Sequence, residues 1–183
     1  QVPEKAFPFP GLFCNCGSAS KPYILDYLSV SVRICRMAHK VSYHNKVLFE
    51  RWVHGMTKTE RTIYALVGPT RYNTLPFSLA IDLAMELLFV QNIAMDDIRV
   101  TRDIYTPVAK QLGKNTAAVS RQIVRLCNLC WDAMLEAGEV EQYLGKPIRD
   151  LRAPNEMIFY LAFLVHFDKP FYHVVQHVPT LLF

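Results

Sequence analysis

The chain has 183 residues, of which 51% are hydrophobic and 20% charged, and it carries a formal net charge of +4. These values are ordinary for a globular protein, exclude a chain that is disordered throughout, and permit nucleic acid as a partner without requiring it. The longest apolar run, residues 157–167, falls well short of the roughly 20 residues that a membrane-spanning helix needs, so we expect no membrane partner.

Residues 1–56 are expected to form an N-terminal extension. They open without an export signal, which favours a cytoplasmic protein. Prolines and glycines are dense before residue 23 and keep that stretch out of long regular elements. Residues 27–35 and 41–49 then alternate between apolar and polar side chains, which favours a β-hairpin, with helix as the competing interpretation. We therefore expect a short irregular or β-hairpin extension, whose role the sequence does not reveal.

The extension contains three of the five cysteines, Cys14, Cys16 and Cys35. Together with His39 they offer four candidate zinc ligands, but their gaps match no zinc module, so a zinc-stabilised extension is only the alternative and we expect no cofactor. An odd number of cysteines without a regular framework, in a cytoplasmic protein, is expected to stay reduced.

A helical domain is expected over residues 57–167. Its first helix, capped by Thr57 or Thr59, should end at Gly68. A second helix is expected over residues 76–92, with a core stripe whose spacings are four, four and three residues: Leu79, Leu83, Leu87 and Val90. A short helix should surround residues 97–103.

Two further helices lie unusually close together in the sequence. Thr106, followed by a proline, predicts the start of a helix that ends before Gly113. Thr116 is predicted to cap the next helix, which should continue to Gly138. Ala109 is small where the two helices must approach, and Gly113 permits a tight left-handed turn. This is the pattern of a helix-turn-helix, although structural bundles also contain such pairs.

The long helix after Thr116 is expected to present two different faces. A projection at about 100° per residue gathers an apolar stripe of Val119, Ile123, Leu126, Cys130 and Met134. The opposite side carries Ala117, Arg121, Arg125, Asn128 and Asp132, flanked by Ser120 and Val124. Arginine can donate two hydrogen bonds to guanine and asparagine can read adenine. We therefore expect the side chains directed toward DNA bases to be Ser120, Arg121, Arg125 and Asn128.

Basic residues are concentrated around this helix pair. Residues 99–131 hold six basic side chains and one acidic side chain, a local net charge of +5. The backbone N–H groups at the start of the long helix can bind phosphate as well. We expect contacts with the DNA backbone from Arg102, Lys110, Lys114, Asn115 and Thr116. For any single one of these side chains, the alternative is an ordinary solvated basic surface.

The last predicted helix begins after residues 154–156 and runs to about Phe167. Its apolar character favours core packing, with a partner-binding surface as the alternative. Residues 168–183 form a C-terminal tail without an assigned element.

Cys127 and Cys130 have the spacing of a redox or zinc pair, but they project onto the core side of the long helix and are expected to be buried thiols. No nucleotide-binding or catalytic motif is present, so we do not expect an enzyme.

Three ordered stretches resemble one known family. VTRDIYTPVAKQLGKNTAAVSRQIVRLCNLCW, residues 100–131, resembles the central block of the DNA-binding effector domain of the stage 0 sporulation protein A family. Upstream, VGPTRYNTLPFSLAI is similar to the family's entry into its second helix, and downstream LRAPNEMIFYLAF is similar to the start of its last helix. The resemblance implies a mainly α, six-helix effector domain of bacterial sporulation that binds DNA as a tandem pair, regulates transcription and contacts the sigma subunit of RNA polymerase.

The chain also departs from the family pattern. Arg121 matches a family arginine that contacts bases, but Ser120 stands where the family has glutamate and Val124 where it has a second arginine. Residues 1–56 are too short for the family's phosphoacceptor receiver domain, so phosphorylation-driven dimerisation is not expected. The leading hypothesis is a sequence-specific transcription regulator that binds double-stranded DNA. The alternative is a module that docks on RNA polymerase or another regulator through its apolar C-terminal helix, without operator reading.

Overall fold

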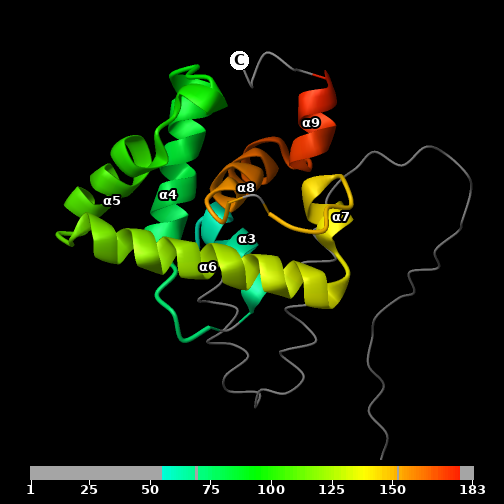
Figure 1. Cartoon of the computed structure of the whole chain (residues 1–183), viewed down its shortest axis with the longest axis horizontal. Coiled ribbons are helices and arrows are strands. Elements are labelled where there is room, and N and C mark those ends of the chain that lie inside the picture. The colour runs from blue at the N-terminus through cyan, green and yellow to red at the C-terminus, as the bar shows by residue number, and fades with distance from the viewer. Residues whose placement is uncertain (1–54, 69, 152, 178–183) are drawn as a thin grey trace, which may run out of the picture.

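The computed structural model describes residues 55–68, 70–151 and 153–177, and this part of the chain is mainly helical, with no strand (Figure 1). Its α-helices are α3 (Lys58–Val67), α4 (Leu75–Met85), α5 (Thr106–Gln111), α6 (Thr116–Ala137), α7 (Val140–Leu144), α8 (Glu156–Phe167) and α9 (Phe171–His177). Two π-helices, η1 (Glu86–Val90) and η3 (Val100–Tyr105), and the 3-10 helix η2 (Met95–Asp97) lie between α4 and α5. Residues 1–54 of the predicted N-terminal extension, with Cys14, Cys16 and Cys35, lie outside the described residues.

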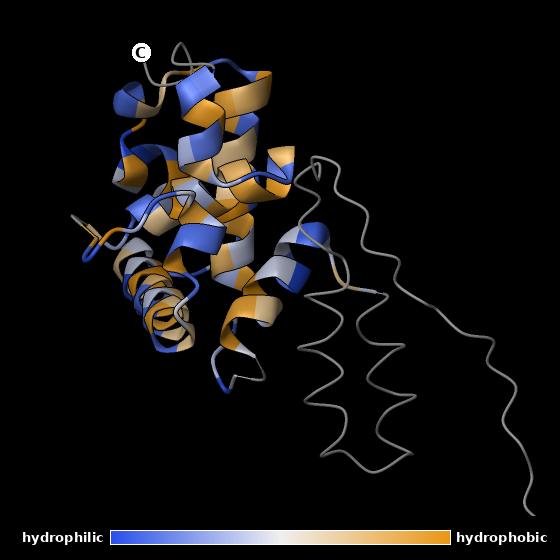
Figure 2. Cartoon of the chain, turned by 90° about the vertical axis from the view of Figure 1, so that its right-hand side faces the viewer, coloured by the Kyte–Doolittle hydropathy of each residue, from blue (hydrophilic) through white to orange (hydrophobic). Residues whose placement is uncertain are grey.

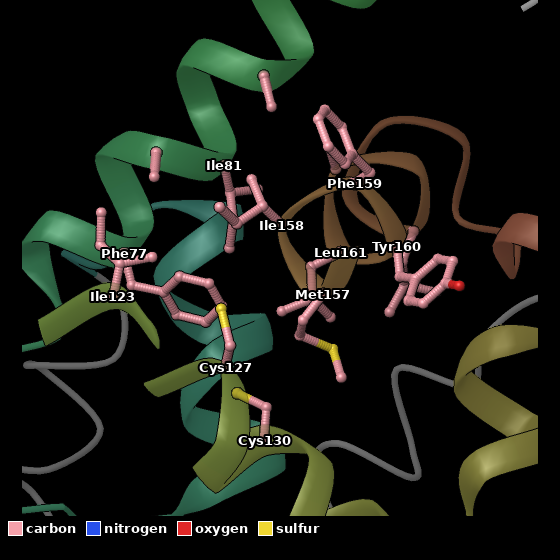
Figure 3. Close-up of a cluster of buried hydrophobic side chains, with 14 of the residues drawn as sticks. Phe77, Ile81, Ile123, Cys127, Cys130, Met157, Ile158, Phe159, Tyr160 and Leu161 are labelled. Atoms are coloured by element: carbon pink, nitrogen blue, oxygen red, sulfur yellow. The ribbon is translucent and has the colours of Figure 1, made fainter. Parts of the chain in front are cut away.

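Helix α8 lies at the centre of the helical core. Its residues 157–165 are all buried, and α3, α4, α6 and α9 pack around it. Figure 3 shows side chains of α4, α6 and α8 meeting in one cluster, among them Phe77, Ile123, Cys127 and Ile158. A helix that is apolar on every side is suited to such a position. Core packing is thus confirmed for α8, and residues 157–165 of this helix offer no exposed apolar surface to a partner.

Helices α3 and α6 are amphipathic, with buried residues on one side and exposed residues on the other, and Figure 2 shows hydrophilic and hydrophobic residues side by side on the helices. Long helix α6 runs across the molecule with α5 at one end and α7 at the other (Figure 1). Within the described ranges, no helix combines the length and apolar character needed to cross a bilayer.

The core stripe expected over residues 76–92 is only partly confirmed. Leu87 on η1 is buried, and Leu79 and Leu83 on α4 pack against the core but are only partly buried. Val90 on η1 is 72% exposed, whereas Phe77 and Ile81 on α4, which were not in the predicted stripe, are fully buried. Because α4 has apolar side chains on several sides, more than one set of its residues has the helical spacing of a core stripe. The buried side of α4 also contains two small side chains, Ala80 and Ala84, in the same core as α8.

The helix starts are partly as predicted. Thr57 caps α3, accepting from the Glu60 amide while the Glu60 carboxylate accepts from the Thr57 amide. Helix α5 begins at Thr106, as predicted, but Thr106 does not cap it. The π-helix η3 runs directly into α5, and the Thr106 hydroxyl donates to the Thr101 carbonyl at 2.9 Å. Thr116 is likewise not the cap of α6. Asn115 caps it, with Oδ1 accepting from the Ala117 amide at 2.8 Å.

Two short helices were not predicted, α7 and α9. Helix α9 lies in the segment expected to be a tail, and it packs into the core through Phe171 and Val174. Gly145, at the end of α7, has a φ of 87°, and a Cβ there would lie 3.0 Å from both Pro170 Cβ and His173 Cδ2. The glycine therefore allows the end of α7 to lie directly against the start of α9.

Candidate nucleic-acid interface

Helices α5 and α6 form a closely joined pair. Gly113 takes a φ of 61° in the turn between them. The Gly113 amide donates to the Lys110 carbonyl at 3.2 Å and the Lys114 amide to the Ala109 carbonyl at 2.9 Å, which completes the last turn of α5. Ala109 and Val119 are buried in the common core. This short turn and shared packing fix the start of α6 relative to α5.

The two faces predicted for α6 are confirmed. All five members of the apolar stripe are buried, together with Cys127 and Trp131. On the opposite side the exposed residues are Ala117, Arg121, Arg125, Asn128 and Asp132. Ser120 and Val124 are half-buried at the edge of this face. Because the buried stripe anchors the helix along its length, the exposed face has a fixed orientation.

A shallow depression of about 510 Å³ lies on this exposed face. It brings together the four side chains predicted to face DNA bases, Ser120, Arg121, Arg125 and Asn128. The remaining lining residues are Tyr72, Val124, Leu129 and Asp132. Along α6 the depression is therefore lined by two arginines, two uncharged polar side chains, one aspartate and two aliphatic side chains, and its one aromatic ring is contributed by a different part of the chain.

That ring belongs to the α3–α4 loop, which the sequence did not associate with the site. The Tyr72 ring centroid lies 5.5 Å from the Arg125 guanidinium carbon, within the range of a cation–π interaction. One residue further along the loop, the Asn73 carbonyl accepts a hydrogen bond of 2.8 Å from Gln122 Nε2 on α6. The loop is thus fastened to α6 by two contacts, and no local spacing in the sequence signals either of them.

The side chains predicted to bind phosphate have different surroundings. Lys110 and Lys114 are exposed on α5 and on the turn, while Thr116 is half-buried at the start of α6. The Asn115 side chain is already engaged as the helix cap. No ion pair to Lys110, Lys114 or either arginine of the depression is formed within the described parts of the chain.

Arg102 differs from the other residues predicted to contact the DNA backbone, because it is already paired with an acidic side chain. Its Nε and terminal nitrogen donate to both carboxylate oxygens of Asp103, at 2.6 and 3.0 Å. The hydrogen bonds from Arg102 hold the pKa of Asp103 below its usual range, and the Arg99 amide adds a further bond. Arg102 therefore lies on η3 as half of a neutralised pair, and it does not line the depression.

The described residues contain no group of three or more histidine, cysteine or acidic side chains arranged to hold a metal ion. Cys127 and Cys130 are free, buried thiols, as predicted. Burial raises the pKa of Cys127 and raises that of Cys130 to about 12, so both remain protonated at neutral pH. The pair on α6 therefore acts as small apolar side chains in the core.

No family model, curated protein or solved structure matches this chain. The arrangement of α5, α6 and the α3–α4 loop is accordingly the basis on which a function can be inferred.

Proposed function

We propose that this chain is a sequence-specific transcription regulator that binds double-stranded DNA, with α5 and α6 acting as a helix-turn-helix. One observation carries the proposal. The exposed face of α6 gathers Ser120, Arg121, Arg125 and Asn128 around a single depression, immediately after a tight turn from α5. These are the side-chain types that hydrogen-bond to the edges of bases, placed on a helix that could enter a major groove.

The surroundings of this face suit the DNA backbone. Lys110 and Lys114 are exposed next to the start of α6, where the positive end of the helix dipole also favours an anion, although Asn115 already accepts from the amides of residues 117–119. In helix-turn-helix proteins, contacts of this kind set the position of the protein while the second helix reads the bases. We assign Lys110, Lys114 and the first turn of α6 to phosphates, and assign no contact to Arg102 because Asp103 already binds it.

The proposal includes the role that the resemblance implies. A regulator of the stage 0 sporulation protein A type would bind tandem sites as a pair and contact the polymerase sigma subunit. Docking without operator reading is not favoured, because α8, the helix on which that hypothesis depended, is buried.

Substitution of Arg121 tests the proposed reading face. Duplexes selected by the wild-type protein from a randomised pool would be titrated by fluorescence anisotropy. Loss of a bidentate arginine–guanine contact costs about 1–3 kcal/mol, so R121A should bind its selected duplex roughly 5- to 150-fold more weakly. Affinity should also fall steeply as salt rises, because phosphate contacts release counterions.

R149A provides the matched control. Arg149 is also exposed, but it lies between α7 and α8 and does not line the depression. It should bind the selected duplex like the wild type. Equal affinities of R121A and the wild-type protein would show that α6 does not read DNA through this face.

A further inference from the structure

The α3–α4 loop contributes an aromatic residue to a helix face that otherwise belongs entirely to α6. Tyr72 is 45% exposed and is not part of the hydrophobic core. Its ring lies under the guanidinium of Arg125, and the neighbouring Asn73 carbonyl is held by Gln122. The ring therefore has a fixed place on the surface, and its main contact with α6 is a charged side chain of the proposed reading face.

This contact restricts the direction of Arg125. A free arginine on a helix surface samples many rotamers, and ordering it on binding costs conformational entropy. A guanidinium that already lies over an aromatic ring has lost part of that freedom before DNA arrives. Arg121, one helical turn earlier, lines the same depression, so the two guanidinium groups lie along one side of α6.

We propose that Tyr72 is a positioning residue that aims Arg125, so that Arg121 and Arg125 together read two guanines in one major groove. Four residues of helix rise about 6 Å, and stacked base pairs are about 3.4 Å apart. The two guanines should accordingly lie about two base-pair steps apart. This inference rests on the proposed DNA-binding function, and it adds a base composition for the site and a role for a loop outside the helix pair.

The experiment uses 7-deazaguanine, which lacks the N7 acceptor that a bidentate arginine requires. Each guanine of the duplex selected by the wild-type protein is replaced in turn, and binding is measured by anisotropy. Two guanines should be sensitive, one of them losing its sensitivity in R121A and the other in R125A. Y72A should weaken binding about two- to five-fold and reduce sensitivity only at the guanine assigned to Arg125.

Two variants separate positioning from general loss of structure. Y72F retains the ring and should bind like the wild-type protein, and the double variant Y72A/R125A should bind no more weakly than R125A. Thermal unfolding of each variant shows whether the fold is retained. A Y72F variant as weak as Y72A, or a loss in Y72A spread evenly over both guanines, would overturn the inference.

The outcomes also distinguish this inference from the proposed function. If the wild-type protein selects no duplex, or R121A binds as tightly as the wild type, the proposed function fails and the positioning role falls with it. If R121A weakens binding but Y72A does not, the DNA-binding function stands and the role of Tyr72 alone is refuted.

Discussion

Asp82 on α4 is held in a partly buried position by a neighbouring helix. The buried Thr59 hydroxyl of α3 donates to Asp82 Oδ1 at 2.5 Å. Burial raises the pKa of this carboxyl above its usual value, the Thr59 hydrogen bond lowers it, and the nearby Glu60 raises it again. Burial prevails, so the fold favours the protonated form.

We expect D82N to be slightly more stable than the wild type at pH 7. The pKa of Asp82 is higher in the folded than in the unfolded state, so the protonated carboxyl group stabilises the fold. This stabilisation is complete below the unfolded-state pKa and is lost as pH rises through the folded-state pKa, which leaves an unfavourable charge at pH 7. Asparagine stays neutral and can still accept from Thr59. Urea unfolding at pH 7 and near pH 4 should show a gain that shrinks at the lower pH. The exposed D96N is the control, and a less stable D82N at pH 7 would mean that the ionised carboxylate stabilises the fold.

At the scale of single residues, the sequence predicted what depends on local geometry. The exposed and buried sides of α6 follow from helical periodicity, so Arg121, Arg125 and Asn128 were placed correctly on one face. The cap was misplaced by one residue, because Asn115 and Thr116 are both good capping residues. Tyr72 was missed for a different reason: the loop meets α6 across 49 residues of sequence, as its Gln122–Asn73 bond shows.

Among the elements, the junction of α7 and α9 depends on Gly145. The residue has a φ of 87°, and an added Cβ would meet the side chains of Pro170 and His173 at 3.0 Å. Alanine would therefore carry two costs: an unfavourable backbone conformation of about 1–2 kcal/mol, and displacement of the start of α9.

We expect G145A to lower the free energy of unfolding by about 2–4 kcal/mol, measured by urea denaturation. G138A is the matched control, since Gly138 has a φ of 66° but open space around its Cβ position. It should show only the backbone cost, about 1–2 kcal/mol. Equal losses in the two variants would mean that α9 moves away from α7 without cost.

The elements themselves were predicted unevenly. Long or well-capped helices such as α3, α6 and α8 were expected with nearly their observed bounds. Helices α7 and α9 are too short to give a periodic signal and are stabilised by packing on the core. The apolar sequence of α4 fitted several stripes, and only the positions of α6 and α8 determine which side is buried.

At the scale of the whole molecule, α8 connects the packing of most other helices. Leu161 is 1% exposed at its centre, in the cluster of Figure 3. Truncation of such a residue leaves a cavity in addition to the lost burial. Because domains of this size are stable by only about 5–15 kcal/mol, one cavity here affects the entire fold, including the orientation of α6.

We expect L161A to lower the free energy of unfolding by about 2–5 kcal/mol in urea denaturation. L135A is the matched control, because Leu135 on α6 is 45% exposed and should cost less than about 1 kcal/mol when truncated. DNA binding by L161A should be lost only under conditions in which the protein unfolds. Similar losses of stability in the two variants would contradict a central role for α8.

The burial of α8 has a consequence during protein synthesis. Ribosomes make α3, α4 and α6 before α8, so the apolar sides of these three helices leave the exit tunnel without the helix that covers them. Partly made chains with uncovered apolar surface are prone to aggregation and are bound by chaperones. Folding of this domain is therefore completed only after α8 has emerged, and a nascent chain stalled before Glu156 should be a chaperone client rather than a folded domain.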